Sequence, residues 1–167
     1  MRRGDKIMTL EELRQKQIDL VGFNCYDEND CLEAIKQNWG AFRYVKEQTP
    51  EICLAAVRED GFVLKYIKEQ TPEICLYAVK QNWAALQFVK EQTPEICLEA
   101  VKESGYALEY VKEQTPEICL EAVRQDGYAL EYVEEQTPEI CLEAVRQDGC
   151  VLRYVNSNIL PLIADKL

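Results

Sequence analysis

The chain has 167 residues, of which 47% are hydrophobic and 29% charged, so it is long enough for one domain and too apolar for a disordered polymer. Its formal net charge is −11, and it contains no histidine. A field of this sign repels phosphate groups, so we expect neither nucleic acid nor an anionic membrane as a partner. The absence of histidine removes the commonest general base and a principal zinc ligand.

Residues 1–24 precede the repetitive part and predict an N-terminal capping helix. Glu12 follows Thr9 by three residues, which is the spacing of a capping box at a helix start. We expect this helix to end near Gly22 and to cover the first repeat. The first twelve residues lack the apolar run of a secretory signal, and no stretch approaches the ~20 apolar residues of a membrane span. We therefore expect a cytoplasmic protein with reduced thiols.

Residues 25–155 contain a unit of 22 residues that occurs six times. A Thr-Pro pair opens five of the units, and Asp27 takes the threonine position in the first. Units 1 to 6 begin at Asp27, Thr49, Thr71, Thr93, Thr115 and Thr137. A fixed short period is the signature of stacked repeats, in which each unit buries its apolar face against its neighbours.

Each unit predicts two helices, as unit 4 illustrates. Thr93 is a good N-cap, and the proline after it suits the first helical position, which predicts a helix over 94–103. Ser104 is a second capping residue and predicts a second helix over 105–114. The predicted fold class is all-α, an α-solenoid of stacked two-helix repeats of 22 residues with terminal capping helices. Residues 156–167 form the C-terminal cap, with a short closing helix over 161–167.

The position after the second cap holds glycine in four units and tryptophan in two, Trp39 and Trp83. Because tryptophan would strain a left-handed backbone, this position belongs to the first turn of the second helix. A small residue, Ala84, follows Trp83, whereas Tyr106 follows a glycine. Such an exchange of volume is typical of a packed site.

Six of the eight cysteines occupy one position of the repeat: Cys31, Cys53, Cys75, Cys97, Cys119 and Cys141. Equivalent helices of stacked units lie ~8–10 Å apart, whereas a disulfide requires Cα atoms within roughly 7 Å. No Cys-x-x-Cys pair or histidine is present to complete a zinc site. We expect buried, inert thiols, with no metal and no cofactor. Cys25 and Cys150 lie outside the frame and are expected to be accessible, with thiol sensing as the alternative.

A column of aromatic residues also follows the repeat: Tyr44, Tyr66, Phe88, Tyr110, Tyr132 and Tyr154. These rings have apolar neighbours at helical spacing, which favours packing between repeats over the stacking of nucleic-acid bases.

Negative charge is concentrated in residues 93–155, which contain fourteen acidic and five basic residues. In each of these units two glutamates lie four residues apart on one face of the first helix: Glu95 and Glu99, Glu117 and Glu121, Glu139 and Glu143. Stacking predicts an acidic ridge, which is either a docking surface for a basic protein or peptide or a solvated face that keeps the array soluble. Tyr77 occupies the same column in unit 3 and is a further candidate contact.

The unit Thr-Pro-Glu-Ile-Cys-Leu-Glu-Ala-Val, continued by Asp-Gly-Tyr-Ala-Leu-Glu-Tyr-Val, resembles a short tandem helical repeat of a family catalogued as a domain of unknown function. This family occurs in viral, protist and bacterial proteins. The resemblance covers about residues 25–155, and unit 1 departs from it by lacking Thr-Pro. It implies a helical fold and carries no established activity, so it transfers no functional residue.

The functional interpretation is a non-catalytic scaffold for protein–protein interaction, because its carboxylates lie in repeated columns whereas active sites are singular. One alternative is a structural array that self-associates by stacking end to end. The near identity of the units in residues 93–155 is also compatible with recent duplication or an engineered consensus array without a dedicated ligand.

Overall fold

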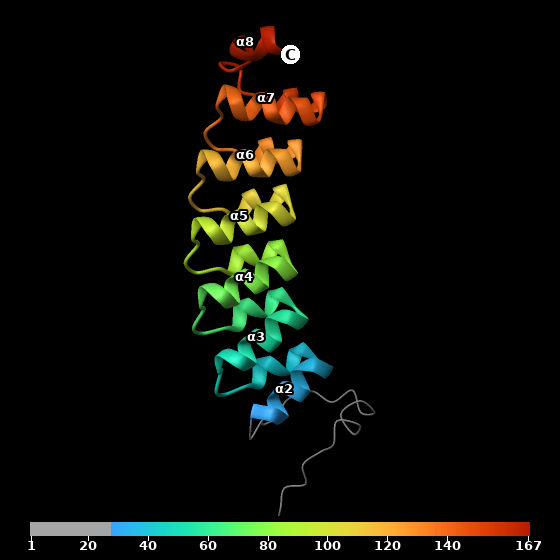
Figure 1. Cartoon of the computed structure of the whole chain (residues 1–167), viewed down its shortest axis with the longest axis vertical. Coiled ribbons are helices and arrows are strands. Elements are labelled where there is room, and N and C mark those ends of the chain that lie inside the picture. The colour runs from blue at the N-terminus through green and yellow to red at the C-terminus, as the bar shows by residue number, and fades with distance from the viewer. Residues whose placement is uncertain (1–27) are drawn as a thin grey trace, which may run out of the picture.

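The computed structural model describes residues 28–167, in which six units of one α-helix and one 3₁₀-helix stack into an elongated array (Figure 1). The α-helices are α2 (Glu28–Gln37), α3 (Pro50–Glu59), α4 (Pro72–Gln81), α5 (Pro94–Glu103), α6 (Pro116–Gln125) and α7 (Pro138–Gln147). The 3₁₀-helices are η1 (Trp39–Tyr44), η2 (Gly61–Tyr66), η3 (Trp83–Phe88), η4 (Gly105–Tyr110), η5 (Gly127–Tyr132) and η6 (Gly149–Tyr154). The array closes with α8 (Leu160–Ile163) and η7 (Ala164–Lys166).

These elements confirm the all-α class and the stacked repeats of 22 residues, and no strand occurs within residues 28–167. The predicted N-terminal helix over 1–24, together with Cys25 and Asp27, lies outside the described residues. No helix among the described residues is long and apolar enough to cross a membrane.

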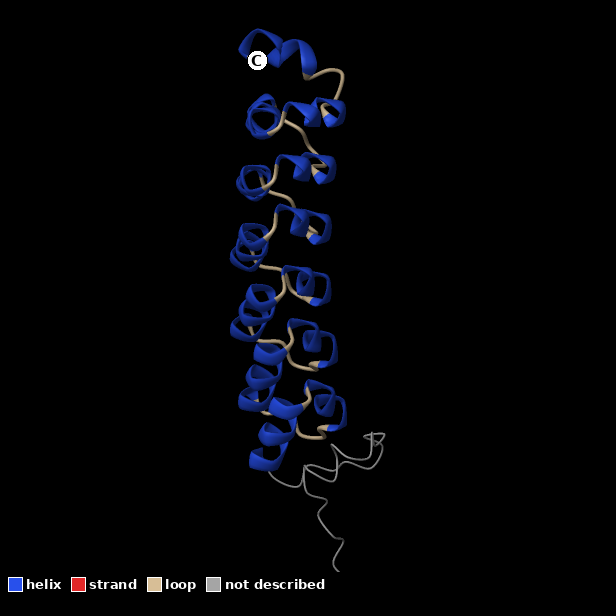
Figure 2. Ribbon diagram, turned by 90° about the vertical axis from the view of Figure 1, so that its right-hand side faces the viewer, coloured by secondary structure: helices blue, strands red, loops and turns tan. Residues whose placement is uncertain are grey.

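The α-helices form one layer of the array and the 3₁₀-helices form the other, as the view in Figure 2 shows. Neighbouring units pack through both layers, since α5 lies against α6 and η4 lies against both α6 and η5. Each unit therefore adds to a continuous interior.

The Thr-Pro pairs start the α-helices as predicted. In unit 4 the Thr93 hydroxyl accepts a hydrogen bond of 3.3 Å from the backbone N–H of Ile96, and equivalent bonds occur at the other four Thr-Pro starts. The predicted first helix over 94–103 is confirmed in full by α5. The threonine therefore satisfies one of the N–H groups that every helix start leaves without a partner in its own helix.

One residue both ends the α-helix and starts the 3₁₀-helix. The backbone N–H of Asp126 donates to the carbonyl of Ala122 at 3.0 Å, and the Asp126 carboxylate accepts from the N–H of Tyr128 at 2.9 Å. Its φ of −149° is extended, so the chain turns there without a left-handed residue. Equivalent side-chain caps occur in the other units except at Ser104, whose side chain makes no capping bond.

The second helix differs from the prediction in type and length. We expected it over 105–114, but η4 is a 3₁₀-helix that ends at Tyr110. Val111 then adopts extended backbone angles, φ −75° and ψ 121°. The N–H of the next residue, Lys112, donates to the side chain of Gln92 in the preceding unit at 2.9 Å. The chain leaves the helix because a neighbouring unit supplies the partner that a longer helix would have supplied.

Glutamine side chains link every pair of consecutive units from unit 2 onward. The amide nitrogen of Gln92 donates to the carbonyl of Tyr110 at 2.8 Å, while its oxygen accepts from Lys112. We call this position, at the end of each unit, the glutamine clamp: Gln48, Gln70, Gln92, Gln114 and Gln136. The sequence analysis assigned these residues no role.

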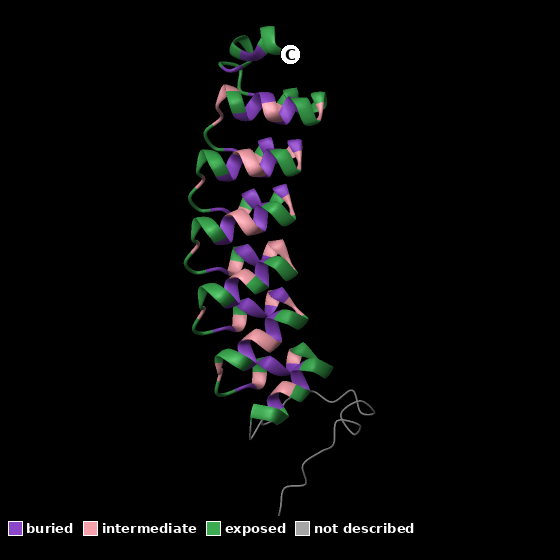
Figure 3. Ribbon diagram, in the orientation of Figure 1, coloured by how far each residue is buried: buried purple, intermediate pink, exposed green. Residues whose placement is uncertain are grey.

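Each unit contributes the same apolar columns to the core. In unit 4 they are Ile96, Cys97, Ala100, Val101, Ala107, Leu108 and Val111, all buried. One hydrophobic cluster joins these columns from Cys31 in unit 1 to Ile163 in α8. Figure 3 shows buried segments in every unit, and within the described part of the chain no polar or charged side chain is buried.

Glycine and tryptophan at the start of the second helix set two different distances between layers. A Cβ on Gly105 would lie 2.5 Å from the carbonyl oxygen of Ala122, so η4 lies directly against α6. With Trp83 at this position, η3 makes fewer close approaches to α5. Trp83 instead stacks on Tyr110 at 6.1 Å, and Tyr106 meets Tyr132 at 6.1 Å edge to face. The aromatic ring thus contacts the aromatic column of the next unit from either position, which confirms the predicted packing role.

Candidate functional site

The six predicted ridge glutamates lie on three consecutive α-helices, α5, α6 and α7, at two equivalent positions. We call the first position the first-turn row: Glu95, Glu117 and Glu139, all exposed. We call the second the second-turn row: Glu99, Glu121 and Glu143, all half-buried. Because the helices stack in register, the two rows run along the α-helical layer.

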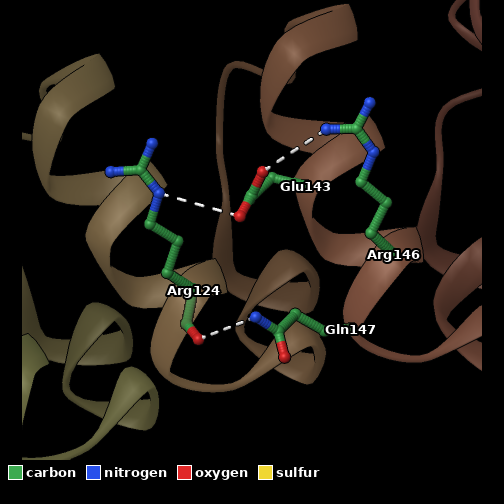
Figure 4. Close-up of polar contacts among 4 residues, drawn as sticks. All are labelled: Arg124, Glu143, Arg146 and Gln147. Atoms are coloured by element: carbon green, nitrogen blue, oxygen red, sulfur yellow. Dashed lines mark hydrogen bonds and ion pairs between the residues drawn. The ribbon is translucent and has the colours of Figure 1, made fainter.

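The second-turn row is engaged with basic side chains of the array. Glu99 lies 3.5 Å from Lys80 of the preceding unit. Glu143 lies 3.7 Å from Arg124 of the preceding unit and 3.9 Å from Arg146 of its own helix (Figure 4). The sequence analysis anticipated the partner within the helix but missed the partners that precede each glutamate by 19 residues.

The first-turn row keeps more of its charge for a partner. Within residues 28–167 no ion pair involves Glu95, Glu117 or Glu139. A surface charge of this kind is solvated and contributes little to stability. The acidic ridge therefore presents one exposed row, while the other row is part of the contact between units.

Tyr77 is 38% exposed and occupies the column of Glu99 one unit earlier. The Arg58 guanidinium lies 4.9 Å from the centre of its ring, across the same step between units that joins Lys80 to Glu99. Behind these pairs, Gln81 donates to the carbonyl of Arg58 at 2.7 Å. The structure thus places Tyr77 on the same layer as the glutamates, with one side of its ring covered by the chain's own cation.

The in-frame cysteines are buried and free, as predicted, and Cys150 is exposed, as predicted. Burial raises the pKa of Cys119 to about 11, and Glu134 adds to this effect. The Cys119 thiol also lies 3.5 Å from the side-chain oxygen of Gln114, so it donates a weak hydrogen bond to the glutamine clamp. Among residues 28–167, no three His, Cys, Asp or Glu side chains lie close enough to hold a metal ion.

The 3₁₀-helical layer carries a second charged column that the sequence analysis did not single out. It is the residue before each Tyr or Phe of the aromatic column, and we call it the flanking column: Arg43, Lys65, Gln87, Glu109, Glu131 and Arg153. All six side chains are exposed. A change of sign at one position of a near-identical repeat is the signal by which the sequence could have revealed it.

Basic members of the flanking column lie over rings of the aromatic column. The Arg43 guanidinium is 5.0 Å from the ring centre of Tyr66, and the Lys65 ammonium is 4.8 Å from the same ring. At the other end, the Arg153 guanidinium is 4.7 Å from the ring centre of Tyr154. These distances are those of cation–π contacts.

A family model with the description "Domain of unknown function (DUF4116)" matches residues 49–93, 71–115, 93–137 and 115–160. Successive matches advance by one repeat and together span residues 49–160, about two thirds of the chain. Unit 1 lies outside them. Comparison with curated proteins and with solved structures found no match.

Proposed function

We propose that this chain, which belongs to the family described as Domain of unknown function (DUF4116), is a non-catalytic scaffold that binds a basic protein or peptide. That it is a helical repeat scaffold follows from its stacked units. The partner class is the proposed part, and the acidic units 4 to 6 are its proposed location.

One observation supports a basic partner above the others: the excess of negative charge is confined to the units that repeat most faithfully. Residues 93–155 carry fourteen acidic and five basic residues, and the exposed first-turn row lies among them. Like charges held on a rigid array attract an oppositely charged chain and increase its association rate.

The non-catalytic part of the proposal rests on the pattern of reactive groups. The chain has no histidine, and its carboxylates recur at equivalent positions of successive units. Catalysis requires one constellation of groups with different roles.

The test is calorimetric titration of the whole chain with two synthetic peptides that differ only in charge. One contains four repeats of Arg-Pro-Ser and the other contains four repeats of Glu-Pro-Ser. We expect the arginine peptide to bind, with an affinity that falls as salt rises, and the glutamate peptide not to bind. Equal binding of both peptides, or of neither, would overturn the proposed partner class.

Self-association is the second candidate, and the apolar end of the array favours it. Leu160, Leu162 and Leu167 are exposed on the closing segment, with Leu162 at 58% and Leu167 at 60%. A second copy is the occupant that would cover this end. The mass measured by light scattering would then rise with concentration and return to that of a monomer in Leu162→Glu, whereas a constant monomer mass contradicts self-association.

A further inference from the structure

The flanking column changes sign along the array, and its basic members show what the neighbouring rings accept. Units 1, 2 and 6 supply their own cations, Arg43, Lys65 and Arg153, to rings of the aromatic column. The Lys65 ammonium also lies 5.9 Å from the ring centre of Phe88 in the next unit. Units 4 and 5 have the same aromatic column but carry Glu109 and Glu131 at the flanking position.

The rings of these two units gather beside the two glutamates. Tyr106 and Tyr132 meet at 6.1 Å between ring centres, and Tyr106 is 38% exposed. Burial is the main cause that raises the pKa of Tyr132, and the carboxylates of Glu109 and Glu131 raise it further. We call this set the η-face site: Tyr106, Glu109, Tyr110, Glu131 and Tyr132.

We propose that the η-face site binds arginine or lysine side chains of an extended basic segment of a partner protein. The proposal rests on the proposed function for the class of partner, and it assigns the contact to the 3₁₀-helical layer instead of the ridge on the α-helical layer.

Charge complementarity selects this occupant. A cation placed over Tyr132, as Lys65 lies over Phe88, would meet a π face together with the carboxylates of Glu109 and Glu131. Asp126 adds another negative charge, since it is the largest cause that raises the pKa of Tyr106. A nucleic acid could stack its bases on the same rings, but its phosphates would face these carboxylates.

The repeat also sets the spacing of the side chains that would bind. Equivalent positions of stacked helices lie ~8–10 Å apart. A polyproline II segment rises about 3.1 Å per residue and completes a turn every three residues, so every third side chain lies on one side at about 9 Å intervals. The segment that fits best therefore carries a basic residue at every third position.

The experiment compares two arginine peptides of identical composition by calorimetry at about 50 mM salt, where surface charges are weakly screened. One contains four repeats of Arg-Pro-Ser, and the other has its four arginines in one block. A single-stranded oligothymidylate of twelve nucleotides is the third probe. We expect the spaced peptide to bind most tightly and the oligonucleotide not to bind.

Three double variants remove the same two charges from different surfaces. Glu109→Gln with Glu131→Gln alters the η-face site, and Glu117→Gln with Glu139→Gln alters the first-turn row. Glu113→Gln with Glu135→Gln alters exposed glutamates between units and serves as the matched control. We expect about a tenfold weaker affinity for the first variant and a change within about twofold for the other two.

Each outcome separates the two proposals. If the first-turn variant loses affinity and the η-face variant does not, a basic partner is supported but the η-face site is wrong. If all three variants weaken binding equally, net charge accounts for it and the η-face site is likewise wrong. If the spaced peptide does not bind the unaltered chain, the proposed partner class fails as well. Binding of the oligonucleotide alone would overturn both proposals.

Discussion

The side chain of Gln92 holds the backbone of Tyr110 in the following unit. Its amide nitrogen donates to the Tyr110 carbonyl at 2.8 Å and to the Leu86 carbonyl of its own unit at 3.2 Å. Its oxygen accepts from the N–H of Lys112 at 2.9 Å. Both polar ends of one amide are thus satisfied across the contact between two units, at the point where each 3₁₀-helix ends.

Replacing Gln92 by alanine should lower the free energy of unfolding by about 1–3 kcal/mol, because half-buried backbone groups lose their partners. Gln92→Glu should be similarly unstable at neutral pH, since a carboxylate cannot donate to the Tyr110 carbonyl, and should recover at acidic pH, when the protonated acid donates again. Gln87→Ala is the control, because Gln87 is exposed and donates within its own 3₁₀-helix. Urea denaturation measures all three, and equal losses for Gln92→Ala and Gln87→Ala would contradict a role for the clamp.

Ser104→Asp should stabilise the protein by about 0.5–1 kcal/mol. Ser104 makes no side-chain capping bond, whereas Asp126 at the equivalent position accepts from Tyr128 at 2.9 Å. Thermal unfolding followed by circular dichroism measures the gain, with Asp126→Ser as the reverse exchange. A melting temperature that does not rise in Ser104→Asp would show that the cap contributes nothing at this position.

Two glycines at one repeat position should respond differently to alanine. A Cβ on Gly105 would lie 2.5 Å from a backbone oxygen of α6, so Gly105→Ala forces the two units apart and should cost about 1–3 kcal/mol. Nothing lies within 4 Å of a Cβ on Gly149, so Gly149→Ala should be neutral or slightly stabilising. Chemical denaturation of both variants tests the difference, and equal effects would argue against the close approach of η4 to α6.

Cysteine labelling should separate Cys150 from the six in-frame thiols. Burial raises the pKa of Cys53, Cys75, Cys119 and Cys141 to about 11, so thiolate is scarce at pH 8, and all six in-frame thiols are shielded from reagent. We expect iodoacetamide to modify Cys150 in the native protein and the others only after denaturation, as read by peptide mass mapping. Rapid native labelling of Cys97 would contradict the packing described.

The same pKa shifts predict a loss of stability at alkaline pH. Unfolded thiols ionise near their ordinary pKa of 9.0, whereas Cys119 in the folded protein holds its proton to about 11. The stabilisation is therefore complete below pH 9 and falls as pH rises from 9 to 11, by at most about 1.4 kcal/mol per pH unit for one thiol. Denaturation of the unaltered chain and Cys119→Ala at pH 8 and 10 should show a shallower decline in the variant, and identical slopes would contradict the shift.

Local chemistry made the α-helices predictable from sequence. Thr93 and its equivalents act on the N–H groups three residues ahead, so their effect is visible in the chain itself. The buried columns followed from the same repeat. The type of the second helix was not predictable in this way, because its end depends on Gln92 of the preceding unit, twenty residues before Lys112.

The candidate surfaces were predictable only as columns. The sequence placed Glu99 and Glu143 on one face, but the cations beside them, Lys80 and Arg124, reach them across the stacking of units. The flanking column was visible in the sequence as a change from basic to acidic residues. Its relation to the aromatic rings required the three-dimensional arrangement of neighbouring units.

Tyrosine ring NMR during titration with the spaced arginine peptide tests the central claim most directly. With ¹³C-labelled tyrosine, we predict that the signals of Tyr106, Tyr110 and Tyr132 move as peptide is added. Tyr77, whose ring already contacts Arg58 on the α-helical layer, should stay in place. Movement of Tyr77 without movement of Tyr132 would place the partner on the α-helical layer and contradict the η-face site.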